Sequence, residues 1–476
     1  MLVPTIALFV ASDSLASISV TAQQVLMTIY IATASVGVAR SFASGTRPIS
    51  LIFYSFSLTW AGIPVAWQLA NQQAAWGDTT LFAYESTVTS ALYFHTGAMV
   101  AFFVGDVFFR AKQKARNVGM IVRTPARSLQ STIVPTYFPH VYVVLSLALS
   151  PLVIKSVGGV GNLFTSRDSM KEQLAAAGVS QAQAGGAIYG IIKIFPGVLA
   201  LSAVMLFLAY MFAPGVARQS NYRNRTNYLW LAAALGLCVM YLNPFTNSRF
   251  ISAGAMIGIV IAMWRPVSRR DGLVVALFAL VGLQVAYPIA NMFRSIDAIQ
   301  QGPQFDSVGY SGPDYDGFQQ IVNSVFFVDS NGYGLGRYIA SGVLYFIPRS
   351  IWESKSTPAS IDVATERGYY FTNLSLPIHA EFFLEFGPLI ALLIMCMMGF
   401  FWAKLDDSWL NYPGSKAAAL VPYIAVAQFA MLRGPVGSLS PIYLSTVALI
   451  AIPLFLVGRR GACKSGGGLA RIDVIE

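Results

Sequence analysis

Apolar blocks of about 20 residues recur along the 476-residue chain, with shorter polar connections between them. A helix of that length spans the hydrocarbon core of a bilayer. Only 11% of the residues are charged and 55% are hydrophobic, whereas about a quarter of the residues of a soluble domain are charged. We therefore predict an all-α polytopic membrane protein, and not the three soluble domains that length alone suggests.

The apolar blocks predict about eleven membrane-spanning helices. Residues 2–10 are apolar but too short to cross a bilayer, so we interpret them as a surface or partly inserted segment, with a short twelfth span as the alternative. The expected spans cover residues 19–39, 50–70, 88–109, 138–155, 187–212, 227–243, 249–264, 272–291, 378–402, 417–435 and 440–458. This divides the chain into an N-terminal bundle of about eight spans (1–291), one large loop (292–377), a C-terminal group of spans (378–458) and a tail (459–476).

The net charge of +10 is distributed as the positive-inside rule requires. The basic residues gather in alternate loops, for example Arg110, Lys112 and Lys114 after the third span and Arg459 and Arg460 in the tail. This pattern indicates membrane orientation and gives no reason to expect a nucleic-acid partner. It predicts a cytoplasmic C-terminus and an extracytoplasmic large loop. The loop is rich in aromatic residues, so we expect it to be structured, with short helices at about 316–328 and before Pro348.

Positive charge on the predicted outer side is the first candidate for function. A cation at the end of a membrane span needs an anion or a polar cavity nearby. Arginine binds phosphate through two parallel hydrogen bonds. The alternative is contact with lipid headgroups or pairing with loop acids. The residues proposed to bind a diphosphate are Arg249, Arg349, Arg294, Arg337, Arg433 and Lys193.

A second group of candidates lies at the entry to the span at 378–402. Glu381 or His379 can act as a general base on a sugar hydroxyl, although an acidic residue in a first helical turn also complements the helix dipole. Trp352, Tyr369 and Tyr370 are candidate glycan-binding residues, with an interfacial aromatic belt as the alternative. His95 and His140 are expected to be structural, and Asp106 and Arg110 to form a local ion pair.

Several familiar catalytic motifs do not occur in the sequence. It contains no GxxxxGK[ST], HExxH, CxxC or GxSxG pattern. The sequence therefore gives no support for a nucleotide-driven pump, a zinc protease or a serine hydrolase. The three cysteines have no metal-ligand spacing, so we interpret them as small buried hydrophobic residues. We also expect no cofactor.

Three stretches between residues 240 and 400 resemble a known family. These segments resemble those of bacterial oligosaccharide repeat-unit polymerases, the O-antigen polymerase (Wzy-type) group. They are NPFTNSRF, PRSIWESKSTP and FTNLSLPIHAEFFLEFG. The resemblance implies a glycosyltransferase at the outer face of the cytoplasmic membrane. Such an enzyme moves a glycan from a polyprenyl diphosphate carrier onto a second lipid-linked repeat unit, with no nucleotide sugar, ATP or metal.

The resemblance also assigns roles to the candidates. Arg249 and Arg349 would stabilise the departing diphosphate, helped by Arg294 and Arg337. Glu381 would be the preferred base and His379 the second choice, and an outer histidine also fits the related O-antigen-type ligases. A polysaccharide or lipid-linked sugar exporter is the non-enzymatic alternative. The expected partners are the lipid-linked oligosaccharides and membrane lipids, with a chain-length regulator and a flippase as further candidates; the product class, whether O-antigen, capsule or exopolysaccharide, stays open.

Overall fold

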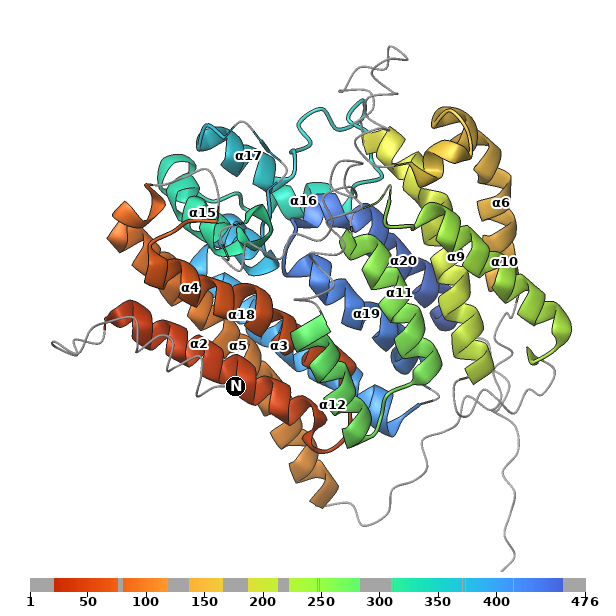
Figure 1. The fold of residues 1–476 in the computed structure, drawn as a ribbon, viewed down its shortest axis with the longest axis horizontal. Coiled ribbons are helices and arrows are strands. Elements are labelled where there is room, and N and C mark those ends of the chain that lie inside the picture. Colours follow the sequence, from red (N-terminus) through yellow and green to blue (C-terminus); the bar gives the residue numbers. More distant parts are fainter. Residues whose placement is uncertain are drawn as a thin grey trace, which may run out of the picture.

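The computed structural model describes most of the chain. The described residues are 21–75, 80–118, 137–165, 187–212, 222–245, 247, 249–282, 310, 312–369, 371–372, 374–413 and 415–456. In those ranges the regular structure is helical (Figure 1). The predicted all-α class is therefore confirmed for the part of the chain that the structure describes.

The helices follow one another in two groups, before and after residue 300. The first group comprises α2 (Ala22–Ala43), α3 (Pro48–Phe56), the π-helical turn η1 (Ser57–Gly62), α4 (Ile63–Asn71), η2 (Leu81–Ala83), α5 (Glu85–Val118), α6 (Phe138–Ser156), η3 (Gly161–Phe164), α9 (Ala187–Phe212), α10 (Arg225–Tyr241), α11 (Arg249–Trp264), α12 (Arg269–Leu277) and η5 (Phe278–Gly282). The second comprises η7 (Pro313–Tyr315), α15 (Gly317–Asn331), α16 (Arg337–Val343), α17 (Ala359–Glu366), α18 (Ile378–Asn411), α19 (Lys416–Met431) and α20 (Val436–Leu456).

Within the described ranges, seven helices are long and apolar enough to cross a membrane. They are Ala22–Ala43, Pro48–Asn71, Glu85–Ala115, Phe138–Ser156, Ile194–Phe212, Ile378–Asn411 and Val436–Phe455. Two shorter apolar helices are Phe250–Trp264 and Lys416–Met431. Each of the remaining predicted spans also overlaps a helix, but the total of eleven stays a prediction. The twelfth span proposed near the N-terminus, residues 283–291 of the eighth span, and the tail lie outside the described residues.

The two longest helices, α5 and α18, pack backbone to backbone. A Cβ atom on Gly105 would overlap the carbonyl group of Cys396, and one on Gly399 would overlap that of Phe102. Small residues allow this close approach, which is how membrane helices gain packing energy without a hydrophobic driving force between them. The pair forms the centre of one of the two apolar cores.

The C-terminal part of α18 is hydrogen-bonded to the N-terminus of α3. Asp406 is fully buried, and its carboxylate accepts hydrogen bonds from the backbone N–H groups of Ile49 and Ser50 and from the Ser50 hydroxyl. These N–H groups have no partner inside their own helix. A carboxylate at a helix N-terminus also complements the helix dipole, so Asp406 stabilises both the helix start and the contact between the two spans.

Helices α15, α16 and α17 gather at one end of the bundle (Figure 1). The predicted helix at 316–328 is present as α15, and the second predicted helix as the shorter α16. Phe318, Ile321 and Val322 of α15 are buried in the same core as α5. The large loop therefore packs into the bundle and contributes to its interior.

A helix covers the predicted span at 378–402, but it is interrupted at Gly387, which was not predicted. Gly387 has φ 76° and ψ 175° inside α18, followed by Pro388, which has no N–H to donate. His379 and Met395 nevertheless line the same cavity of about 20 Å³, although 16 residues of continuous helix would separate them by about 24 Å. The chain therefore turns back at Gly387, and residues 378–386 lie alongside residues 388–411.

Candidate functional site

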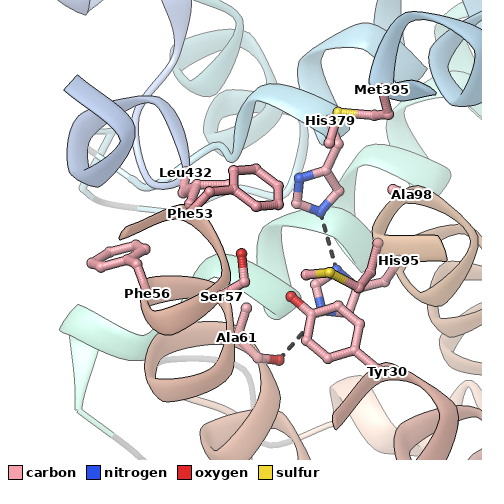
Figure 2. Close-up of a pocket in the computed structure, with 11 residues that line it drawn as sticks. Tyr30, Phe53, Phe56, Ser57, Ala61, His95, Ala98, His379, Met395 and Leu432 are labelled. Carbon is pink, nitrogen blue, oxygen red and sulfur yellow. Dashed lines mark hydrogen bonds between the residues drawn. The ribbon is translucent and has the colours of Figure 1, made fainter. Parts of the chain in front are cut away.

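Because the chain turns at Gly387, His379 lies inside the helix bundle. The His379 side chain is buried against Phe94 and His95 of α5. Figure 2 shows its ring beside that of His95. His95 lies ten residues after the first residue of α5, so His379 sits about 15 Å along that helix from its predicted outer end. The sequence predicted His379 at the entry to the span at 378–402; in the structure its ring is packed inside the helix bundle.

The two imidazoles form a hydrogen-bonded pair whose proton positions follow from their neighbours. His95 Nε2 lies 3.3 Å from the carbonyl oxygen of Ala61, which can only accept, so this nitrogen carries the proton. His95 Nδ1 is then the acceptor for His379 Nε2–H at 3.0 Å. His379 Nδ1 is left with a free lone pair. The His379 ring lines the 20 Å³ cavity together with Tyr30 and Ser57 (Figure 2). A cavity of that size has room for about one water molecule.

A charged cluster lies at the end of α19, and we call it the Arg433 cluster. The Arg433 guanidinium donates to Asp314 at 2.7 Å and to the Ser375 hydroxyl at 3.2 Å. The backbone N–H of Ser375 in turn donates to Asp316 Oδ2 at 3.1 Å. The cluster therefore consists of Arg433, Asp314, Ser375 and Asp316, with two carboxylates around one guanidinium.

The Arg433 cluster is enclosed in part by neighbouring helices, and the Arg433 side chain is only 18% exposed. The Arg433 guanidinium lies 4.5 Å from the ring centroid of Phe250 and 5.7 Å from that of Trp60. Both rings belong to spanning or near-spanning helices. Arg433 is thus partly enclosed by the bundle and held by ion-pair and cation–π contacts.

Helices α3 and α4 hold the acidic turn in place. Trp60 Nε1 donates to the carbonyl oxygen of Asp314, and Gln68 Nε2 donates to the carbonyl oxygens of Tyr310 and Tyr315. The turn PDYDG places Asp314 in η7 and Asp316 just before α15. Neither acid was among the residues predicted from the sequence. The signal that points to them is a pair of acids two positions apart, next to proline, tyrosine and glycine.

Asp316 combines burial with an unused acceptor. Its side chain is 1% exposed, and Oδ1 has no hydrogen-bond partner among the described residues. Burial raises the pKa of Asp316, while the nearby Arg433 charge and the hydrogen bonds from Ser375 lower it in part. A carboxylate with a raised pKa and a free oxygen is a general-base candidate.

Glu381 and Glu385 each accept from the start of another helix. Glu381 Oε2 accepts from the backbone N–H of Val436, the first residue of α20, at 2.6 Å. Glu385 accepts from Gly336 and Ile339, at the start of α16. Both side chains are fully buried, and Glu381 Oε1 has no partner among the described residues. The geometry gives both residues a capping role and leaves one oxygen of Glu381 available for chemistry.

The other predicted cations are less tightly gathered. Arg337 is exposed and donates to the Tyr338 hydroxyl, and Arg349 is exposed in the turn after α16. Arg249 is the first residue of α11 and Lys193 lies within α9, but their side chains, and all of Arg294, fall outside what the structure describes. Arg249 precedes Phe250, whose ring contacts Arg433. Of the six predicted cations, the structure therefore places Arg433 in a buried polar cluster and Arg337 and Arg349 toward solvent.

The predicted glycan-binding aromatics differ in their surroundings. The Tyr369 hydroxyl accepts from Gln319 and Asn323 of α15, so this ring is tied into the loop interior. Trp352 is half-buried and donates to Ser354 close by in sequence. Tyr370 lies outside the described residues.

Three structural predictions can be compared directly with contacts. The Asp106–Arg110 ion pair is confirmed at 2.6 Å. His140 contacts Asn227 at 2.9 Å, in keeping with a structural role. His95 is buried as expected, but its pairing with His379 was not foreseen.

The described residues contain no group of three or more His, Cys, Asp or Glu side chains that could hold a metal ion. The polar groups described above are carboxylates, imidazoles and a guanidinium. Comparison with known proteins adds no further assignment, since no family model, curated protein or solved structure matches the chain.

Proposed function

We propose that this protein is a membrane glycosyltransferase that polymerises polyprenyl-diphosphate-linked oligosaccharide repeat units at the outer face of the bacterial cytoplasmic membrane. The observation that supports it most is the Arg433 cluster: a partly enclosed guanidinium with two carboxylates, on the side of the bundle that the basic loops predict to be extracytoplasmic. The three sequence stretches that resemble those of O-antigen polymerases support the same proposal. The lipid carrier supplies the leaving group, so the reaction needs no separate energy source.

The proposed roles follow from the contacts. Asp316 Oδ1 takes the proton from the acceptor hydroxyl, because it is a buried carboxylate oxygen with no other partner among the described residues. Arg433 holds the acidic turn through Asp314 and Ser375. Arg249, which opens the helix beside it, binds the diphosphate with Lys193 and Arg294. Glu381 is the alternative base, through Oε1. Trp352 and the exposed Arg337 and Arg349 contact the glycan or the approaching carrier from the loop.

The test uses purified protein in lipid nanodiscs. The substrate is the lipid-linked repeat unit extracted from a strain that lacks the protein, and the products are separated by carbohydrate gel electrophoresis. Wild type should produce a ladder, and Asp316→Asn should lower the rate by at least about 100-fold, the usual contribution of a general base. Asp329→Asn, which changes an exposed acid in α15, is the matched control and should keep the ladder.

The same assay separates the alternatives. Loss of the ladder with Glu381→Gln but not with Asp316→Asn would move the base to Glu381. If wild type transfers preformed chains to a lipid acceptor and makes no ladder, the protein is a ligase. A full ladder from Asp316→Asn, Arg433→Gln and Glu381→Gln alike would overturn the site assignment.

A second candidate function is export of a lipid-linked sugar, and one observation favours it. The chain turns at Gly387 inside a membrane segment and places the His95–His379 pair within the bundle. Interrupted helices and intramembrane polar groups are typical of transporters. Sealed proteoliposomes distinguish the two functions, because an exporter moves the lipid-linked unit across the bilayer without changing its length, whereas a polymerase lengthens it.

A further inference from the structure

A separate polar cavity lies at the opposite end of the bundle from the Arg433 cluster. Its volume is about 340 Å³, and it opens between α5, the end of α18 and the residue that precedes α3. The charged groups that line it are Arg47, Arg110, Lys114 and Asp407. The basic loops predict this end to be cytoplasmic. We call it the Lys114 cavity.

Most of the charges around the Lys114 cavity are already engaged. Arg110 is paired with Asp106 and also donates to the carbonyl oxygen of Arg40. Asp407 accepts from the side-chain amides of Gln113 and Asn411. The buried Asp406 behind the cavity is satisfied by the start of α3. The lining itself holds three cations and one carboxylate, and the carboxylates of Asp406 and Asp106 lie close enough to interact with the Arg47 charge.

Lys114 and Arg47 supply the donors that remain. Lys114 is exposed and has no ion pair or hydrogen bond among the described residues. Arg47 makes one long hydrogen bond, 3.4 Å from Nη1 to the carbonyl oxygen of Arg40. An ammonium group and a guanidinium on the same cavity suit a phosphate group, which accepts from both.

An apolar surface leads along the helices to the Lys114 cavity. On the outward face of the closely packed α5–α18 pair, Val104 and Phe108 of α5 and Met397 and Phe401 of α18 are exposed. They precede the charged lining residues Lys114 and Asp407 by six to ten residues, which is about two to three helical turns on the same two helices. Such a surface fits the acyl chains of a lipid, while the cavity fits its headgroup.

We propose that the Lys114 cavity binds the phosphate of an anionic glycerophospholipid from the adjacent leaflet, with its acyl chains along the α5–α18 surface. Basic pockets between membrane helices on the cytoplasmic side commonly take anionic headgroups. Lys114 and Arg47 contact the phosphate, and the apolar surface distinguishes a lipid from a free phosphate ion. This site is independent of the proposed glycan transfer.

The test titrates the full-length detergent-purified protein with phosphatidylglycerol and counts bound lipids by native mass spectrometry. Removal of one contacting cation, in Lys114→Gln, should weaken binding about fivefold, which corresponds to about 1 kcal/mol per basic residue. Arg225→Gln removes an exposed charge on α10, at the same predicted end of the bundle, that does not line the cavity. It is the matched control and should bind as wild type does. Equal melting temperatures of the lipid-free variants would show that both are folded.

Three results would overturn the proposal. The first is an equal loss of affinity in Lys114→Gln and Arg225→Gln, which would reflect general surface charge. The second is equally tight binding of phosphatidylcholine, which has no net charge. The third is competition by inorganic phosphate at concentrations similar to those of the lipid, which would mean that the cavity holds a free anion.

Discussion

At the scale of single residues, the chemistry of the site depends on Asp316 and its surroundings. The carboxylate is buried, one oxygen accepts from the backbone of Ser375, and the other has no partner among the described residues. Burying a carboxylate costs free energy unless its charge is compensated. Arg433 supplies part of that compensation through the shared Ser375.

The raised pKa of Asp316 gives a testable dependence of stability on pH. Because burial raises the pKa, the folded protein keeps this proton to higher pH than the unfolded chain, in which the pKa is about 3.9. The free energy of unfolding contributed by this group therefore falls as pH rises through the raised value. Asp316→Asn should melt at the same or a higher temperature than wild type at pH 8, and the difference should shrink toward pH 4.

Thermal melts in detergent across that pH range measure the effect. Asp329→Asn, at an exposed position, should show no such trend. A lower melting temperature of Asp316→Asn at every pH would mean that the ionised carboxylate is stabilising, in conflict with the burial argument.

The histidine pair gives a second prediction. Replacing His379 by leucine leaves His95 Nδ1 buried without its donor, which should cost about 1–3 kcal/mol of unfolding free energy. The double variant His95→Leu, His379→Leu removes both polar partners and should be less unstable than the sum of the single variants. Chemical denaturation in a mixed-detergent system measures the three values. Strict additivity would show that the two imidazoles do not interact.

The site was only partly predictable from sequence at this scale. Arg433 was identified because a cation at a span end is unusual and invites a partner. Asp314 and Asp316 were missed, because a pair of loop acids resembles an ordinary solvated turn until the loop is known to enter the bundle. His95 was judged structural for a similar reason, since its partner lies 284 residues away.

At the scale of elements, the turn within α18 controls where Glu381 and His379 lie. Gly387 has a positive φ that an L-residue adopts only with strain. A Cβ atom there would also lie 3.1 Å from the Tyr333 ring. Gly387→Ala should therefore lower the unfolding free energy by about 1–2 kcal/mol and reduce activity through displacement of residues 378–386.

A matched substitution tests whether the conformation is the cause. Gly236 lies inside α10, where a Cβ would meet nothing within 4 Å. Gly236→Ala should leave stability unchanged or raise it by up to about 1 kcal/mol. If both alanine variants behave alike in the same denaturation assay, the left-handed backbone at Gly387 is not the source of the effect.

Helix positions were predictable, but the turn was not. The apolar blocks located the spans because a run of about 20 apolar residues in a helix has few alternatives in a bilayer. A Gly-Pro pair inside such a block is also common in continuous, kinked membrane helices. Only the placement of His379 beside Met395 shows that the chain folds back.

At the scale of the whole molecule, the orientation in the membrane can be measured directly. With Cys238, Cys396 and Cys463 replaced, a cysteine is introduced at Asp329 in α15 or at Lys112 in α5, both exposed. The basic loops predict that a membrane-impermeant maleimide labels position 329 in cells with a permeabilised outer membrane, and position 112 only after lysis. The reverse pattern would invert the topology and place the Arg433 cluster on the cytoplasmic side.

The segment 378–386 joins parts of the molecule that are distant in sequence. Glu381 holds the first N–H of α20, and Glu385 holds the start of α16. A ligand that shifts this short segment would therefore also move the N-termini of α16 and α20, because both are hydrogen-bonded to it. Binding of a substrate beside Arg433 would in this way displace α16, in the large loop, and α20 together.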